Sequence, residues 1–343
     1  MNSYLPVLAL QQDTALRQHH ADVVNEFSRP ALARRSEDLY RQFSGRFIAW
    51  CHAHDYPDTV PVDPDLIIAW LSDMAEKGNA VSTIGVALCS VKYLHAQSGV
   101  ELGNRRKIAN ALRHIRRRYG RAQDQAEALK PDLLGEILRT APKNMLDTRD
   151  YAMLALAYVF ALRRSELISL DHGESGDGGG VLTISMDSVR ITLHRSKESQ
   201  EAPEAVAIPR DANPRAVGAV DRWIRDAAIA PGTPIVRALT ARGGHVRQER
   251  LSADMAARAM RACIFRHLIG IGMSADDARE KASGFSGHSG RVGFVVSATE
   301  AGARHEDIAK VTRHRPNSTM LRRYGEQADQ LRTSPHRLNG VGV

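Results

Sequence analysis

An uninterrupted run of twelve apolar residues, Tyr151 to Leu162, constrains the fold of this chain more than any other feature. It is bounded by Asp150 and Arg163. A helix that crosses a bilayer needs about 20 such residues, so the run is too short to span a membrane. A helix that is apolar on all sides is normally enclosed by other elements of a folded core. The run therefore predicts a buried helix over 149–162 and a globular domain built around it.

The chain has 343 residues, which suffices for two domains with separate cores. Helical patterns precede the apolar run, and extended runs follow it at 181–186, 189–194 and 205–209. We therefore predict a mainly α-helical protein with a small antiparallel β-sheet. The predicted parts are a mobile N-terminal segment over 1–25, a helical domain over 26–121, a linker over 122–129, and an α+β domain with a C-terminal tail over 130–343.

The net charge of +8 is unevenly distributed along the chain. Residues 102–123 hold eight basic residues and no acidic one, and residues 286–343 hold nine basic against five acidic. In the helix expected over 106–118, Ile108, Leu112 and Ile115 form an apolar stripe, and most of the arginines lie off it. A clustered basic face indicates contact with a polyanion. The alternative is an ordinary solvated helix surface.

Several other classes of protein are disfavoured. The N-terminus lacks the basic start and long apolar stretch of a secretory signal, and three widely spaced cysteines, Cys51, Cys89 and Cys263, favour reduced thiols in the cytoplasm. The glycine-rich turn over 172–180 lacks the Gly-Lys-Ser/Thr ending of a phosphate-binding loop. The cluster Cys51-His-Ala-His54 lacks a second pair of zinc ligands. We expect no cofactor, no metal and no membrane partner.

Four short motifs in the second half of the chain carry the candidate chemistry. They are Ala161-Leu-Arg-Arg-Ser-Glu166, Ser196-Lys197, Gly287-His288-Ser-Gly-Arg291 and His314-Arg-Pro-Asn-Ser-Thr-Met-Leu-Arg-Arg-Tyr324. In this order and spacing, and together with the patterns Phe47–Cys51 and Leu112–Arg117, the chain resembles the tyrosine site-specific recombinases, the phage integrase family. The resemblance covers nearly the whole chain. It implies a helical core-binding domain and a catalytic domain that form a clamp around DNA.

The resemblance also implies the roles of individual residues. The implied catalytic set is Arg163, Lys197, His288, Arg291, His314 and Tyr324, with Glu166 in support. Tyr324 would attack the scissile phosphate and form a 3′-phosphotyrosyl bond. Guanidinium groups suit the charge that develops on the non-bridging oxygens, and an ammonium group suits protonation of the departing 5′ oxygen. His288 would act as a base or as a hydrogen-bond donor to the phosphate, and His314 would donate to the phosphate.

Two of these assignments have neighbouring alternatives. Arg164 is adjacent to Arg163, but the family spacing places the catalytic arginine three residues before Glu166. His314 lies ten positions before Tyr324, whereas the family usually has nine. Either the loop around Pro316-Asn317 absorbs one residue or Arg315 takes the place; we favour His314. Tyr119, in the basic stretch, would be the next candidate nucleophile.

DNA contacts are expected from both domains. Candidates for phosphate contacts are Arg105, Arg106, Lys107, Arg113, Arg116, Arg117, Arg118 and Arg121, and the resemblance suggests Arg258 as a base-reading residue. It further implies a homotetramer on paired inverted-repeat DNA sites, formed from monomers or weakly associating subunits, and a place at the nucleoid. The alternatives are a type IB topoisomerase-like or telomere-resolving enzyme that uses the same residues, and a catalytically silent DNA-binding protein. The DNA target does not follow from the sequence.

Overall fold

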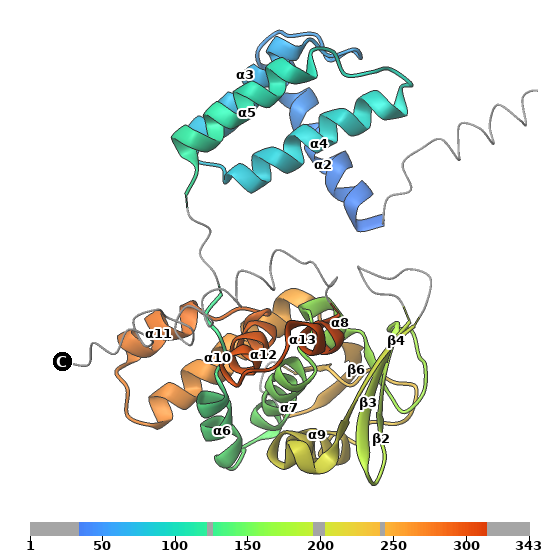
Figure 1. The fold of residues 1–343 in the computed structure, drawn as a ribbon, viewed down its shortest axis with the longest axis vertical. Helices are drawn as coiled ribbons and strands as arrows, with labels where there is room; N and C mark the ends of the chain where they lie inside the picture. Colours follow the sequence, from blue (N-terminus) through green and yellow to red (C-terminus); the bar gives the residue numbers. More distant parts are fainter. Residues whose placement is uncertain (1–33, 122–125, 195–202, 241–243, 314–343) are drawn as a thin grey trace, which may run out of the picture. The chain divides into compact units, whose positions relative to one another are not determined.

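The computed structural model describes residues 34–121, 126–194, 203–240 and 244–313. The predicted N-terminal segment over 1–25 lies outside these residues. The chain divides into two compact units, Met1–Gln123 and Asp124–Val343. Figure 1 shows helices alone in the described part of the first unit and helices with β-strands in the second. Within the described residues, no helix is long and apolar enough to cross a membrane.

The first unit is a small helical bundle. Its helices are α2 (Arg34–Ala53), α3 (Pro64–Glu76), α4 (Val81–Gln97) and α5 (Arg105–Tyr119). Helix α2 packs on α4, and α3 packs on α5. Phe47 and Trp70 meet in the core, with ring centroids 5.0 Å apart. The Asp63 side chain caps α3 by accepting from the Asp65 N–H, with Pro64 in the first turn.

The second unit combines helices with two small sheets (Figure 1). Its helices are α6 (Pro131–Arg139), α7 (Met145–Val159), α8 (Arg164–Ile168), α9 (Pro214–Asp226), α10 (Ala253–Gly270), α11 (Ala275–Ser283), α12 (Ser289–Glu300) and α13 (His305–Thr312), with a 3₁₀ turn at Arg210–Ala212. Its strands are β1 (Leu170–His172), β2 (Gly180–Ile184), β3 (Ser188–Leu193), β4 (Glu204–Pro209), β5 (Arg237–Leu239) and β6 (Val246–Arg250). The predicted fold class, mainly α-helical with a small sheet, is confirmed.

The main sheet has the order β1-β2-β3-β4. Strands β2, β3 and β4 pair antiparallel at the three predicted runs. Strand β1 joins them in parallel, with Leu170 opposite Gly180, a pairing the sequence did not indicate. Strands β5 and β6 form a separate antiparallel pair, which the sequence also did not indicate.

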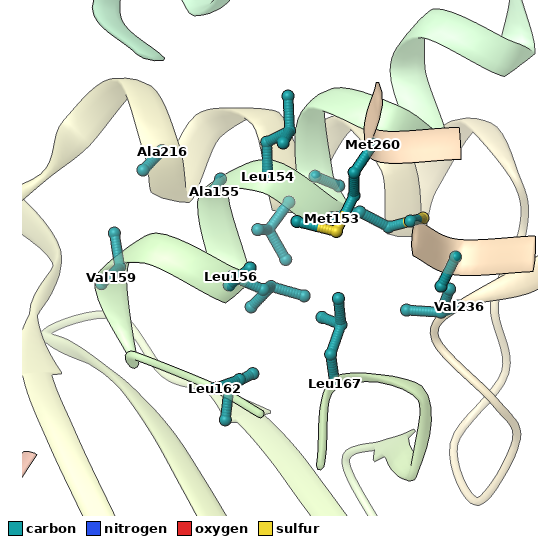
Figure 2. Packing of buried hydrophobic residues seen from close by; sticks show 14 of the residues in the cluster. Met153, Leu154, Ala155, Leu156, Val159, Leu162, Leu167, Ala216, Val236 and Met260 are labelled. Carbon is teal, nitrogen blue, oxygen red and sulfur yellow. The ribbon is translucent and has the colours of Figure 1, made fainter. Parts of the chain in front are cut away.

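The apolar run forms most of α7, the central helix of the second unit. Met153, Leu154 and Leu156 are at most 1% exposed, and α7 packs against α9, α10 and α12. Figure 2 shows Met153 and Leu156 gathered with Leu167, Val236 and Met260 from surrounding elements. The prediction of a buried helix is therefore confirmed, although the helix ends at Val159 and not at Leu162.

A tight turn ends α7 just before the first candidate catalytic residue. The Ala161 N–H donates to the Tyr158 carbonyl and the Leu162 N–H donates to the Ala157 carbonyl, which is the hydrogen-bond pattern of a Schellman motif. Ala161 takes a φ of 46°, a left-handed conformation that favours glycine. This turn leaves the carbonyls of Phe160 and Ala161 without partners in the helix.

The second half of the predicted linker belongs to the second unit. The Glu127 N–H donates to the Gly284 carbonyl (2.8 Å), and the Leu129 N–H donates to the Ser289 carbonyl (2.9 Å). Leu129 is fully buried in the core, where a Cβ on Gly293 of α12 would collide with its backbone. The rest of the predicted linker has only small or polar side chains. Burial of the Leu129 side chain therefore explains why this end of the linker is fixed to the second unit.

Candidate active site

Arg163 lies in the turn between α7 and α8, where Glu166 holds both its backbone and its side chain. Oε2 of Glu166 accepts from the Arg163 backbone N–H (2.8 Å), and Oε1 accepts from Nη1 of Arg163 (2.7 Å). Glu166 is at the third position of α8, so its carboxylate reaches back to the residue before the helix, as in a capping box. The three-residue spacing of the motif thus has a local structural reason.

Arg164, the neighbouring alternative, extends to another partner. Its Nη1 forms an ion pair with Oδ1 of Asp254 on α10 (3.0 Å). Its aliphatic stem lies against Gly287, where a Cβ would collide with it. This geometry gives Arg164 a packing role beside the site and leaves Arg163 with Glu166.

Arg291 comes from the first turn of α12 and is buried. Its Nη1 donates to the Ala161 carbonyl (2.9 Å), one of the carbonyls left by the end of α7. Gly290 allows this approach, because a Cβ there would collide with Ala157 of α7. The Gly-Arg pair of the motif therefore serves both close helix packing and placement of the guanidinium.

His288 immediately precedes α12. The surrounding protein lowers the pKa of its imidazole below the ordinary 6.5, first through partial burial of the ring and then through the positive charges of Arg291, Arg164 and Arg163. Glu166 opposes the shift. The same charges therefore act on one imidazole, and they favour its neutral form at neutral pH.

Arg313 is a further member of this cluster, which sequence reasoning missed. It follows α13, is 6% exposed and has a φ of 55°. Its Nη2 donates to Oε2 of Glu166 (2.9 Å), and both Nη atoms lie 3.3–3.4 Å from the Phe160 carbonyl. The sequence signal was only a basic residue beside His314, because Glu166 lies 147 positions earlier.

The remaining predicted catalytic residues, Lys197, His314 and Tyr324, lie outside the described residues. The structure thus brings together Arg163, Glu166, His288 and Arg291 around the end of α7. Among all the residues that the structure describes, no group of three or more His, Cys, Asp or Glu side chains could hold a metal ion. Cys51 is buried in the core of the first unit.

The basic residues predicted to contact DNA are all exposed. On α5, Ile108 and Ile115 are buried in the core of the first unit, whereas every lysine and arginine of the helix points to solvent. Arg105 lies 3.5 Å from Glu101, and Lys107 pairs with Asp65. Arg116 and Arg117 form no ion pair with any described residue. In the second unit, Arg258 is exposed on α10.

Comparison with known proteins agrees with this arrangement. Residues 127–330 match the phage integrase family. The chain is 28% identical to an integrase/recombinase xerD homolog of Selenomonas ruminantium over 291 residues, 82% of this chain and 79% of that protein. It is 25% identical to the recombinase cre of Escherichia phage P1 over 317 residues, 89% of this chain and 86% of that protein.

Solved structures share the fold. The integrase of transposon Tn1549 in complex with transposon right-end DNA has a TM-score of 0.56 at 16% identity, covering 92% of this chain and 98% of that chain. The XerH site-specific recombinase bound to a palindromic difH substrate has a TM-score of 0.51 at 13% identity, covering 83% and 74%. With the family match over more than half of the sequence, this chain belongs to the phage integrase family, the tyrosine recombinases, which are DNA strand-transfer enzymes.

Proposed function

We propose that this protein is a site-specific DNA recombinase that cleaves and rejoins strands through a 3′-phosphotyrosyl intermediate at paired inverted-repeat sites. The observation that carries the proposal is the cluster around the end of α7, where Glu166 orients the guanidinium group of Arg163 and the Ala161 carbonyl orients that of Arg291, beside His288. Such a cluster suits a phosphodiester, whose non-bridging oxygens gain charge in the transition state.

In this proposal Arg163 and Arg291 bind the scissile phosphate. Arginine stays protonated while it donates, and its planar fork matches two phosphate oxygens. Buried, pre-oriented donors need little reorganisation when the charge develops, so they lower the barrier more than flexible surface cations would. His288, neutral at neutral pH, is suited to accept a proton or to donate a hydrogen bond to the phosphate.

Tyr324 is the proposed nucleophile, His314 a donor to the phosphate and Lys197 the acid that protonates the leaving 5′ oxygen. The attack forms a bond between the tyrosine oxygen and the phosphorus and breaks the bond to the 5′ oxygen. The phosphotyrosyl bond is again a phosphodiester, so a 5′ hydroxyl can reverse the step without an added energy source.

The exposed face of α5 and Arg121, which follows the helix, are proposed to hold the DNA backbone. Their charges would supply salt-dependent affinity and positioning, and Arg258 would contribute base contacts. Support comes from the relatives, which are named as recombinases, and from the structural neighbours, which were solved with DNA. We further propose a homotetramer on paired sites and action at the nucleoid.

The test is a search for a covalent protein–DNA adduct. Nicked fragments of the DNA that flanks the gene are incubated with the protein, denatured in detergent and analysed for protein attached to a 3′ end. We expect an adduct with the wild type and with Tyr119→Phe, and none with Tyr324→Phe. An adduct that persists in Tyr324→Phe would refute the assigned nucleophile.

A second measurement concerns the outcome of the reaction. Plasmids with two copies of the reactive fragment are incubated with the protein, and the topology of the products is examined. Recombinant circles or inversions support site-specific recombination. Relaxation of supercoils without exchange would favour a topoisomerase-like activity instead.

A further inference from the structure

Glu166 is shared by two arginines from distant segments. Its Oε1 accepts from Arg163, and its Oε2 accepts from Arg313 as well as from the Arg163 backbone N–H. The side chains of Glu166 and Arg313 are only 8% and 3% exposed. Figure 1 shows α13, which Arg313 directly follows, beside α8, which carries Glu166. The three groups therefore form a triad in which the acid lies between two cations; Glu166 and Arg313 are buried and Arg163 is partly buried.

The backbone at Arg313 indicates that the side chain is needed there. Its φ of 55° is a conformation that glycine adopts freely and that is unfavourable for other L-residues. The Nε atom is also buried without a hydrogen-bond partner among the described residues. Arg313 thus has an unfavourable backbone conformation and an unpaired buried nitrogen. Its contacts with Glu166 and with the carbonyls at the end of α7 must compensate for both, which points to a role for these contacts.

The charges of the triad suggest what this role is. If Glu166 faced Arg163 alone, one negative and one positive charge would cancel, and the arginine would approach a phosphate as part of a neutral pair. With Arg313 bound to the other oxygen, the three side chains carry one net positive charge. In agreement, although burial of the Glu166 carboxyl favours its neutral form, the charges of Arg313 and Arg163 hold its pKa below the usual range.

We propose that Arg313 is a positioning residue for DNA cleavage. It offsets the negative charge of Glu166, so that Glu166 can orient Arg163 without cancelling the positive charge that Arg163 presents to the scissile phosphate. The proposal rests on the proposed function of Arg163. It also ties the end of α13, directly before His314 in the sequence, to the turn that carries Arg163. Arg313 itself need not touch the DNA.

The first test is a double-mutant cycle in single-turnover cleavage of a DNA fragment that reacts with the wild type. Arg313→Gln is expected to lower the rate about tenfold or more at saturating protein, with little change in DNA affinity. In a Glu166→Gln background, where there is no negative charge to offset, the same change is expected to cost less than about threefold. An equal cost in both backgrounds would overturn the proposal. Arg304→Ala, an exposed arginine just before α13, is the matched control.

A second substrate separates positioning from a general structural defect. DNA with a methylphosphonate at the scissile position lacks the negative charge that Arg163 would neutralise. The defect of Arg313→Gln relative to the wild type is expected to shrink on this substrate. A defect of the same size on both substrates would mean that Arg313 does not act through charge at the phosphate.

A third measurement needs no DNA and separates failure of this proposal from failure of the proposed function. The pKa of the Glu166 carboxyl is followed by NMR in the wild type and in Arg313→Gln, with Arg313→Lys as a charge-retaining variant. We expect the pKa to rise in Arg313→Gln and to rise less in Arg313→Lys. An unchanged pKa in Arg313→Gln refutes the role of Arg313 even if the wild type cleaves DNA, whereas a wild type without adduct refutes the function.

Discussion

The arginines of α5 and the arginines around the end of α7 carry the same charge in opposite surroundings. Those of α5 are exposed, and among the described residues only Arg105 has an acidic side chain, that of Glu101, within 4 Å. Arg291 and Arg313 are buried, and together with Arg163 they bind carbonyls and one carboxylate. Exposed cations can each contribute a small, salt-screened attraction along a polyanion. Oriented, desolvated cations can act strongly on one phosphate.

The largest effect on the cleavage rate is expected at the buried set, the arginines around the end of α7. Arg291→Lys keeps the charge but loses the planar fork and the fixed hydrogen bond to the Ala161 carbonyl. We expect the single-turnover cleavage rate to fall about 10²–10³-fold, with DNA affinity nearly unchanged. Rapid-quench measurement of the covalent adduct checks this, with circular dichroism to verify folding. If Arg291→Lys instead lowered only the DNA affinity, the arginines around the end of α7 would behave like those of α5, and the distinction between the two sets would fail.

His288 provides a pH-dependent check on the buried set. Partial burial and the nearby guanidinium groups lower its pKa, so it stays neutral to a more acidic pH than an ordinary histidine. If the neutral ring is the active form, the cleavage rate holds steady down to below pH 6.5 and then drops about tenfold per pH unit. The drop in rate at acidic pH is expected to disappear in His288→Gln. It is expected to remain in His305→Gln, which alters an exposed histidine. An acid limb centred above pH 6.5 would contradict the lowered pKa.

The exposed set is tested by removing two adjacent charges. Arg116→Ala combined with Arg117→Ala is expected to weaken DNA binding about tenfold at moderate salt and to reduce the slope of log affinity against log salt by about 2. Cleavage at saturating protein should stay at the wild-type rate. Fluorescence anisotropy titrations at several salt concentrations measure the slope. Arg225→Ala, an exposed arginine paired with Asp226 on α9, serves as the matched control.

The smallest expected effect is on the free energy of unfolding. It comes from comparing the same backbone conformation at a buried and at an exposed residue. Ala161 and Ala228 both follow a helix with a φ of 46–47°, but Ala161 is buried and Ala228 is exposed. Glycine relieves the strain at both, whereas only at Ala161 does it also remove a buried methyl group, worth about 0.8 kcal/mol. Ala228→Gly should therefore have the higher free energy of unfolding by roughly that amount. Urea denaturation of the two variants measures it, and equal values would contradict the burial argument.

Much of this fold could be predicted because its signals are local. The twelve-residue apolar run forms α7, and the Asp63-Pro64 pair begins α3. The basic stretch on α5 has the expected buried stripe. Helix α9, which was not predicted, also had a local signal, since Pro214 precedes Ala216, Val217, Val220 and Trp223, all of them buried.

Other features depend on contacts that no short motif contains. Strand β1 is only three residues long and is defined by its parallel partner. Arg313 has meaning only beside Glu166, which lies 147 residues away. The family motifs identified Arg163, His288 and Arg291 as candidates, but the hydrogen bonds to the end of α7 became visible only in three dimensions.

The insertion of Leu129 into the core has a consequence for how domains of this kind can be exchanged. Because Glu127 and Leu129 are bonded to residues on either side of His288, the catalytic unit effectively begins before them. A fusion that joins a different DNA-binding module after residue 129 would discard a buried side chain and two backbone hydrogen bonds next to the site. Chimeric recombinases with a new first module should therefore be spliced upstream of Glu127.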